Sequence, residues 1–373
     1  MTQQQLTIQN LGQSLDDLAN LDPRGYGVCK ILYQASRRYT GAPISMNAAG
    51  KLVETVKEGD FVYILTGFVL RPYKKAEMDG IVSAMLLARA LVIAFGAKPV
   101  IICPEDNYKA VQKLAVCVGL HLFEDVEELK EIPVSMGVVC FTKDAAKAEA
   151  QADQILAKMP PSALVSIECP GANENGVYHN AVGLDVTALE AKQDILFEKV
   201  QKLGILNIAI GDLGNELGMG TIGDTLRKYI PYAGEGACNC GCGGGIAVRT
   251  KADHIITATV SDWGCYAMIA AMAYLMENLD IMHTAELEKE AIETASNSGM
   301  IDMYGWLVPA IDGFGLTMNL SIVSLMREMV KSALELKIKC RQWFEKVDEL
   351  GYFEGITSCE AACAPGQKGE HYE

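Results

Sequence analysis

Short apolar runs alternate with helix-length segments along most of the chain, and this alternation limits the possible folds more than any other feature. Runs of strand length lie at 61–65, 99–103, 136–141, 163–168, 206–210 and 254–260. Helical segments are expected at 77–96, 107–118, 143–159, 187–203, 263–276 and 321–350, with a helical region near the N-terminus. Strands and helices that alternate at these lengths favour an α/β fold, with a parallel or mixed sheet covered by helices on its faces.

A double proline at 160–161 ends one of the helical segments and marks the expected boundary between two lobes. We expect an N-terminal α/β lobe over 1–160 and a C-terminal α/β lobe over 161–355 that carries a loop rich in glycine and acids. An acidic cleft is expected between the lobes, and a mobile tail over 356–373. A chain of 373 residues is long enough for two domains.

The charge balance excludes some classes of partner. Asp and Glu number 47 against 32 Lys and Arg, which gives a net charge of −15. This excess counts against nucleic acid or an anionic membrane as the main partner. No apolar run reaches the roughly 18–20 residues that span a bilayer, and the first residues show neither a signal-peptide nor a transit-peptide pattern. We therefore expect a cytoplasmic protein that acts on a small molecule, either alone or as a homo-oligomer.

Three of the twelve cysteines, Cys238, Cys240 and Cys242, follow one another in a C-x-C-x-C pattern beside several glycines. Zinc sites are typically built from C-x-x-C pairs and further ligands at set spacings. No fourth ligand stands nearby in that format, so we expect a flexible, exposed, thiol-rich loop, with a bound metal as the alternative. The other cysteines are mostly expected to be reduced thiols in apolar surroundings.

Carboxylates follow predicted strands or open a predicted helix at three places, always beside glycine or asparagine. Because ligands of open α/β sheets bind beyond the carboxyl ends of the strands, these carboxylates are expected to meet at one place. Clustered carboxylates repel one another, and a divalent cation such as Mg²⁺, Mn²⁺ or Ca²⁺ would relieve the repulsion. The alternative is that each acid is a helix cap or a turn residue. The expected metal ligands are Glu77, Asp79, Glu168, Asp212 and Glu216.

The segment 211–220 contains four glycines but follows neither the dinucleotide fingerprint nor the P-loop pattern. Its backbone amides could instead approach an anion closely. His254, which opens the last predicted strand, is the best placed of the five histidines for catalysis, although a lone histidine often has a structural role. A nucleophile elbow of the form G-x-S-x-G is absent from the sequence.

From about residue 20 to about residue 330, the chain resembles the C-terminal domain family of D-glutamate cyclase, with the family's motifs in the same order. The matching patterns are T-G-F at 66–68, E-x-D-G at 77–80, S-I-E-x-P-G-x-x-x-x-G-x-Y-x-N at 166–180, G-D-x-G-N-E-x-G-M-G at 211–220, A-D-H at 252–254, S-x-W-G-x-Y at 261–266 and D-G at 312–313. The resemblance implies a carbon–oxygen lyase in which the amine of a small amino acid attacks its own side-chain carboxyl to form a lactam, or the reverse reaction. A divalent cation would polarise the carboxylate.

Roles follow from the resemblance for several residues. Candidate catalytic residues are His254, Glu216 and Asp212. Candidate substrate-binding residues are Gly171, Asn175, Tyr178, Asn180, Asn215, Ser261, Trp263 and Asp312. Cys169 stands where the family pattern has arginine, so we expect a substrate with a neutral or basic side chain in preference to glutamate. Two alternative functions use the same features, a divalent-metal-dependent phosphatase and a non-catalytic protein that binds an amino acid or metabolite.

Overall fold

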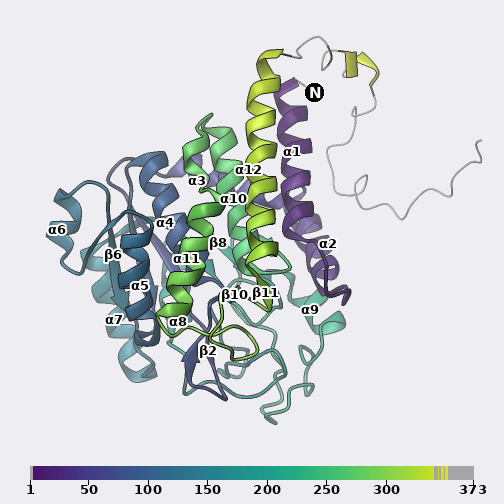
Figure 1. Ribbon diagram of the computed structural model, residues 1–373. Helices are drawn as coiled ribbons and strands as arrows, with labels where there is room; N and C mark the ends of the chain where they lie inside the picture. Colours follow the sequence, from purple (N-terminus) through teal and green to yellow (C-terminus); the bar gives the residue numbers. More distant parts are fainter. Residues whose placement is uncertain (1–2, 340–342, 344–345, 348, 352–373) are drawn as a thin grey trace, which may run out of the picture.

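A seven-stranded parallel sheet forms the centre of the molecule in the computed structural model, which describes residues 3–339, 343, 346–347 and 349–351 (Figure 1). The strand order is β5-β6-β4-β1-β7-β8-β9, and every neighbouring pair is parallel. The strands are β1 (Phe61–Thr66), β4 (Lys98–Cys103), β5 (His121–Phe123), β6 (Ser135–Cys140), β7 (Pro161–Ile167), β8 (Leu206–Gly211) and β9 (His254–Thr257).

The central strand β1 shows why these apolar runs become buried strands. All of its residues are buried. Side chains alternate along a strand, so Val62 and Ile64 contact the core on one face of the sheet while Tyr63 and Leu65 contact the core on the other. A strand that is covered on both faces needs a continuous apolar sequence, which is typical of parallel sheets.

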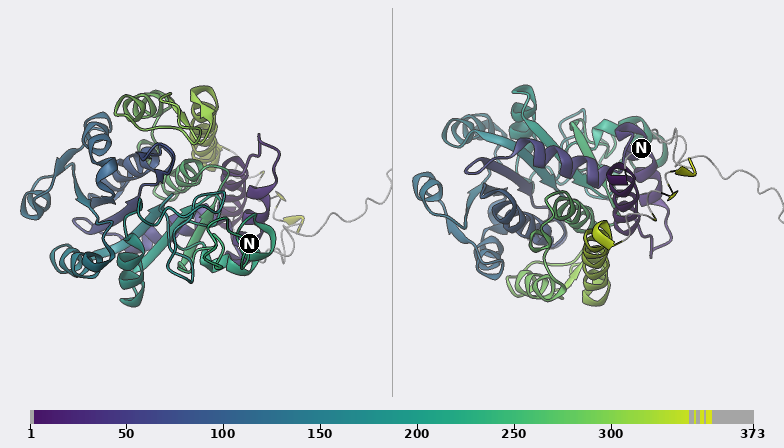
Figure 2. Two further views of the ribbon diagram at one scale, coloured as in Figure 1. Left: turned by 90° about the horizontal axis from the view of Figure 1, so that it is seen from below. Right: turned by 90° about the horizontal axis from the view of Figure 1, so that it is seen from above.

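Helices cover both faces of the sheet, as the two views of Figure 2 show. On the first face, α10 is buried along almost its whole length and packs against α3, α4, α1 and α12. The helices of this face are α1 (Gln3–Ala19), α3 (Ile44–Thr55), α4 (Ile81–Phe95), α5 (Glu105–Cys117), α10 (Ser261–Leu275), α11 (Ala285–Asn297) and α12 (Leu316–Lys339).

The second face is covered by shorter helices that pack on the other core. They are α2 (Val28–Thr40), α6 (Val126–Glu131), α7 (Ala145–Lys158), α8 (Gln193–Lys202) and α9 (Gly223–Tyr229). Within the part of the chain that the structure describes, no helix has both the length and the apolar content that a membrane span requires.

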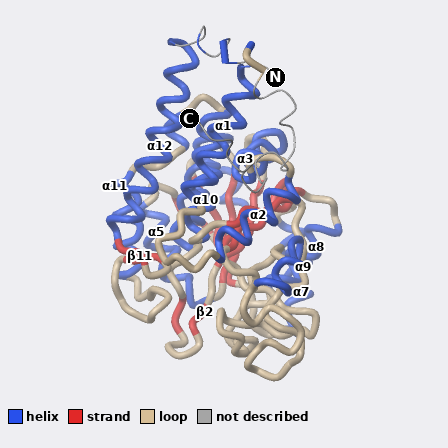
Figure 3. The backbone as a smooth tube through the Cα atoms, turned by 90° about the vertical axis from the view of Figure 1, so that its right-hand side faces the viewer, coloured by secondary structure: helices blue, strands red, loops and turns tan. Residues whose placement is uncertain are grey.

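Two small hairpins and two short 3₁₀ helices complete the fold. The hairpin of β2 (Val69–Leu70) and β3 (Lys75–Ala76) lies between β1 and α4, and the hairpin of β10 (Ala310–Ile311) and β11 (Phe314–Gly315) precedes α12. The 3₁₀ helices are η1 (Gly220–Ile222) and η2 (Leu279–Ile281). Long loops gather at one end of the molecule, and α1 and α12 extend toward the opposite end (Figure 3).

The predicted α/β class with a helix-covered sheet is confirmed, but the expected pair of lobes is not what the structure shows. One sheet crosses the expected boundary at residue 160, because β1 pairs with β4 on one side and with β7 on the other. Pro161, expected to lie at a lobe boundary, begins β7 in the middle of this sheet. The segment 356–373, predicted to be a tail, lies outside the described residues.

Candidate functional site

The strand order reverses between β1 and β7, and a pocket opens there. After β1 the chain passes through α4 to β4 on one side, whereas after β7 it passes through α8 to β8 on the other. Loops that leave two such strands diverge and form a crevice beyond the carboxyl ends of the strands. The pocket has a volume of about 330 Å³, and its walls come from the segments after β1, β7 and β8 and from the segment before α12. This volume lies at the lower end of the range for small-molecule sites.

Carboxylates from all of these segments meet in the pocket. Those that line it are Glu77, Asp79, Glu168, Asp212 and Asp312. Carboxylate oxygens of Asp79, Asp212 and Asp312 lie within 4.8 Å of one another, and those of Glu168, Asp212 and Glu216 form a second group of the same size. Asp212 belongs to both groups. The expected convergence of acids from separate strand ends is therefore confirmed.

The backbone of two pocket residues is held in a conformation that residues with side chains rarely adopt. Glu168 has a φ of 43° and Asp312 a φ of 50°, both in the left-handed region. Strained residues of this kind concentrate at functional sites, where the surrounding structure enforces them. Gly80 packs directly on this region, since a Cβ at position 80 would lie 2.6 Å from the Cβ of Glu168.

Two helices, α4 and α10, begin beside the pocket, and each is capped by an aspartate that belongs to the other or directly precedes it. The Asp79 carboxylate accepts hydrogen bonds from the backbone N–H groups of Ser261 and Asp262 at the start of α10, at 3.2 and 3.1 Å. The Asp262 carboxylate in turn accepts from the backbone N–H groups of Gly80, at 2.8 Å, and of Ser83, at the start of α4. The positive ends of two helix dipoles therefore lie beside the carboxylate cluster and stabilise its negative charge.

Two further hydrogen-bonding groups fix the positions of the acids. The Ser261 hydroxyl donates to the Glu168 carboxylate at 2.7 Å. The fully buried Glu216 accepts from the backbone N–H groups of its own loop, at residues 212, 213 and 214, over 3.0, 2.8 and 2.6 Å. Glu216 therefore shapes the loop that presents Asp212, in addition to contributing to the second carboxylate group.

Burial and mutual repulsion make the pocket favour protons or a cation. Burial raises the pKa of Asp79, Glu168 and Asp212, and the charges of neighbouring carboxylates raise each pKa further. Burial, with the charges of Asp312 and Asp302, also raises the pKa of Glu77 to about 8. No described residue donates a hydrogen bond to the Glu77 side chain, so its carboxyl group can exchange a proton with a ligand.

Two arginines that no sequence motif marks lie at the site. Arg24 donates a hydrogen bond to the Asp312 carboxylate, and this interaction opposes the effect of burial on the pKa of Asp312. The exposed Arg71 lies in the wall of the pocket, in the turn between β2 and β3. Arg24 is 288 residues away from Asp312 in the sequence, so no local pattern could have linked the two.

His254, the predicted catalytic histidine, does not line the pocket. It is the first residue of β9 and pairs with Ile208, whereas the pocket carboxylates follow the carboxyl ends of the strands. Burial lowers the pKa of His254, and the charges that act on it belong to Asp253, Lys51 and Glu54. We therefore do not assign the catalytic base to His254.

Among the predicted substrate-binding residues, Asn180, Asn215 and Asp312 line the pocket. Ser261 reaches the pocket indirectly, through its bond to Glu168. Four others hold the fold together instead. The Tyr178 hydroxyl donates to Asp194, and the Trp263 indole donates to Asn319 at 2.8 Å. The remaining two are Gly171, packed against Val248 and Leu217, and Asn175, which donates to the Cys242 carbonyl.

Cys169 does not line the pocket either. Its side chain is fully buried in the core on the second face of the sheet, beside residues such as Leu217. Cys169 therefore belongs to the core and is not among the residues that line the pocket. The position of Cys169 therefore gives no structural support to the expected preference against an acidic substrate, and that preference stays a prediction.

The cysteine loop also differs from the prediction. Cys238 is buried, Cys240 and Cys242 are half-buried, and the ring of His179 lies against all three. None of the three cysteines is exposed, although an exposed loop was expected. A fourth donor, His179, stands 61 residues before Cys240 in the sequence and approaches it only through the fold.

Comparison with known proteins gives two matches. A family model described as "D-glutamate cyclase-like, C-terminal" matches residues 15–327 of the chain. The mitochondrial D-glutamate cyclase of Homo sapiens is 35% identical over 113 residues, a match that spans 30% of the chain and 17% of the human protein. The chain thus matches well under two thirds of the length of this relative.

Proposed function

The chain belongs to the D-glutamate cyclase-like C-terminal family, and we propose that its acidic pocket binds a divalent cation together with a small amino acid or its lactam, and interconverts the two. The observation that carries this proposal is the meeting of five carboxylates in one small pocket at the strand-order reversal between β1 and β7. Human D-glutamate cyclase, a partial relative, supports glutamate as the first substrate to test.

The donor atoms in the pocket fit Mg²⁺, Mn²⁺ or Ca²⁺. Such cations prefer hard oxygen ligands, and either group of three carboxylates within 4.8 Å offers them. Asp79, Asp212 and Asp312 would hold the ion in one arrangement, and Glu168, Asp212 and Glu216 in the other. A bound cation would offset the repulsion among the acids and polarise a substrate carboxyl group.

The proposed reaction needs a group that accepts and returns protons. In lactam formation the substrate amine nitrogen bonds to the side-chain carboxyl carbon, the carbon–oxygen bond breaks, and two of the three ammonium protons leave with that oxygen as water. Glu77 suits this role, because its pKa of about 8 lets it accept a proton from the ammonium and donate it to the departing oxygen near neutral pH. Run in the opposite direction, the same steps open a lactam with water.

Arg71 is the proposed partner for a substrate carboxylate. Arg71 lines the pocket and is exposed, and a guanidinium can make two parallel hydrogen bonds to a substrate carboxylate. The substrate ammonium would then face the acids deeper in the pocket. This arrangement suits an amino acid, whose two charged groups have opposite signs.

The experiment uses the purified full chain. D- and L-glutamate, glutamine, ornithine, lysine and their lactams are incubated with Mg²⁺, Mn²⁺ or Ca²⁺, products are followed by NMR, and cation affinity is measured by calorimetry. We expect cation-dependent turnover, and we expect Asp212→Asn to weaken cation binding about tenfold or more, equivalent to about 1.4 kcal/mol. The exposed Asp224, replaced with asparagine, is the matched control and should change neither property.

Three results would overturn the proposal. Cation affinity that is the same in the wild type and in Asp212→Asn would place the ion elsewhere. Cleavage of phosphate esters without turnover of any amino acid or lactam would favour the phosphatase alternative. Tight binding of an amino acid without any reaction would identify a non-catalytic binding protein.

A further inference from the structure

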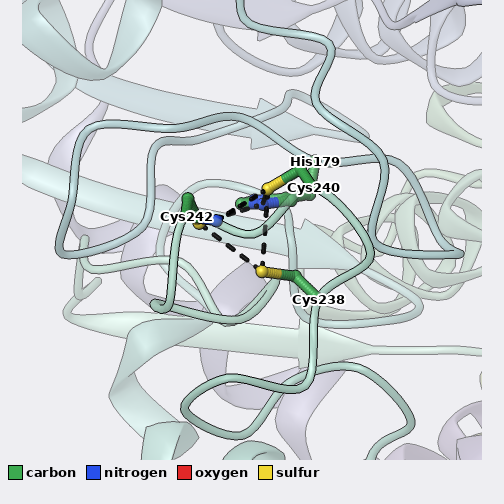
Figure 4. Close-up of side chains that lie close together, drawn as sticks. All are labelled: His179, Cys238, Cys240 and Cys242. Carbon is green, nitrogen blue, oxygen red and sulfur yellow. Dashed lines mark hydrogen bonds between the residues drawn. The ribbon is translucent and has the colours of Figure 1, made fainter.

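We propose that Cys238, Cys240, Cys242 and His179 bind one zinc ion, which fixes the loop that forms one wall of the acidic pocket. This site is separate from the carboxylate cluster and differs from it in chemistry. The three thiols come from the loop after α9, and the imidazole comes from the loop after β7 (Figure 4).

Three of four measured distances among the donor atoms come within about 0.3 Å of those in a tetrahedral zinc site, and the fourth is about 0.5 Å shorter. The Cys238 sulfur lies 3.5 Å from that of Cys242 and 3.6 Å from that of Cys240. The Nε2 atom of His179 lies 3.1 and 3.5 Å from the sulfurs of Cys240 and Cys242. Tetrahedral zinc with Zn–S of about 2.3 Å and Zn–N of about 2.05 Å places sulfurs about 3.8 Å apart and sulfur about 3.6 Å from nitrogen.

The ring of His179 is directed at the sulfurs and at nothing else that the structure describes. His179 is 1% exposed, and its Nδ1 atom is buried without a partner among the described residues. The only polar contacts of the ring in that part of the chain are therefore those of Nε2 with the cysteines. With Nε2 facing the sulfurs of Cys240 and Cys242, the neutral imidazole can bind a metal through Nε2 while Nδ1 keeps the proton.

The surrounding backbone supports charged sulfurs. The backbone N–H of Cys242 donates to the Cys240 sulfur at 3.4 Å, and the backbone N–H of Gly244 and the side-chain amide of Asn173 donate to the Cys242 sulfur at the same distance. Hydrogen bonds to the ligand atoms orient them and tune a metal site.

The donor set identifies zinc as the ion. Three thiolates and one imidazole form a Cys₃His set, which is common in structural zinc sites, whereas Mg²⁺ and Ca²⁺ prefer oxygen. All four donor atoms lie within 4.8 Å of one another, so they surround one ion rather than a cluster of several metals. Because the protein supplies all four ligands, no coordination position remains for a substrate, and the role of the ion is structural.

The loop that the ion would fix lies against the acidic pocket. The carbonyl of His179 accepts a hydrogen bond from Asn215, at 2.9 Å, and the residues that follow it, 180–182, line the pocket. On the other side, Asn239 of the cysteine loop donates from its side chain to the Val182 carbonyl at 2.7 Å and from its backbone to the Gly183 carbonyl at 2.8 Å. Zinc would thus join the two loops where one of them forms the pocket wall.

The test measures metal content, independently of any enzymatic activity. The full chain is purified, dialysed against metal-free buffer and analysed by mass spectrometry for zinc, and we expect about one zinc per chain. Cobalt exchanged into the site should give the visible absorption of tetrahedral cobalt bound to thiolates. Cys242→Ser should retain about a tenth or less of the wild-type zinc. Cys140→Ser, at a half-buried cysteine in β6, is the matched control and should keep it all.

The cobalt spectrum of the wild type decides the question even where Cys242→Ser fails to fold. Absence of both stoichiometric zinc and the cobalt bands would overturn the proposal, as would a disulfide between two of the three cysteines or stoichiometric iron in place of zinc. Equal zinc in Cys242→Ser and Cys140→Ser would overturn it as well. Asp212→Asn should keep its zinc, so failure of the acidic site and failure of the zinc site give different results.

Discussion

Replacing Glu77 with glutamine should make the stability of the cation-free protein less sensitive to rising pH. Burial, with the charges of Asp312 and Asp302, raises the pKa of Glu77 from 4.5 to about 8 in the folded protein. Between these values the folded protein holds a proton that the unfolded chain has released. The stability due to this proton is complete below the unfolded pKa and is lost as the pH rises through the folded pKa.

The size of the effect follows from that pKa. One group that titrates in this way changes the free energy of unfolding by about 1.4 kcal/mol for each pH unit inside the window. From a pH of about 5.5 to about 7.5, Glu77 alone should therefore lower the free energy of unfolding by about 3 kcal/mol. Glutamine does not titrate, so the free energy of unfolding of Glu77→Gln should rise by about 3 kcal/mol relative to that of the wild type over the same pH interval.

Urea unfolding, followed by circular dichroism at both pH values without added divalent cations, measures the effect. Glu131→Gln changes an exposed residue at the end of α6 and should leave the pH dependence as it is in the wild type. If the difference in unfolding free energy between Glu77→Gln and the wild type is the same at both pH values, Glu77 titrates as an exposed carboxylate and the reasoning about this pocket fails.

Two further substitutions test the pocket wall and the packing behind it. Arg71→Ala should raise KM for an amino-acid substrate about tenfold with little change in kcat, because the lost ion pair weakens binding of the substrate and of the transition state alike. Steady-state kinetics measures both values, with the exposed Arg38→Ala as the control. A change in kcat alone would contradict the role assigned to Arg71. Gly171→Ala would place a Cβ 2.3 Å from the Val248 side chain, so urea unfolding should show a loss of about 1–3 kcal/mol. Gly50→Ala, inside α3 with open space around it, should instead stabilise the protein by up to about 1 kcal/mol, and equal effects of the two changes would contradict the packing described.

The main strands of the sheet could be predicted because their apolar runs are long and buried on both faces. All six predicted strands are found, although with shifted ends. The one strand of the sheet that was missed, β5, has only three residues, none of them buried, and its two apolar residues are too few to form a recognisable run. The single sheet was not foreseen, because the proline pair at 160–161 resembles a linker and because the pairing of β1 with β7 depends on contacts between distant segments.

The acids of the site were predictable because each follows a strand or opens a helix beside glycine. Their partners were not. Asp262 is not among the site residues expected from the sequence, whereas in the fold it caps α4 across 182 residues of sequence. His179 carries no local signal of its role, since no spacing rule links it to cysteines that follow about 60 residues later in the chain.

The exchanged caps of α4 and α10 also determine when the pocket can form. Asp79 caps a helix that begins 182 residues further along the chain, and that helix supplies the cap for α4 in return. Contacts between such distant residues form slowly, because a long loop must close first, and chains fold from the N-terminus as they are synthesised. While only the first part of the chain has folded, Asp79 and the amides of α4 remain in water without their partners. The pocket carboxylates are therefore brought close to one another only after α10 has packed on the sheet.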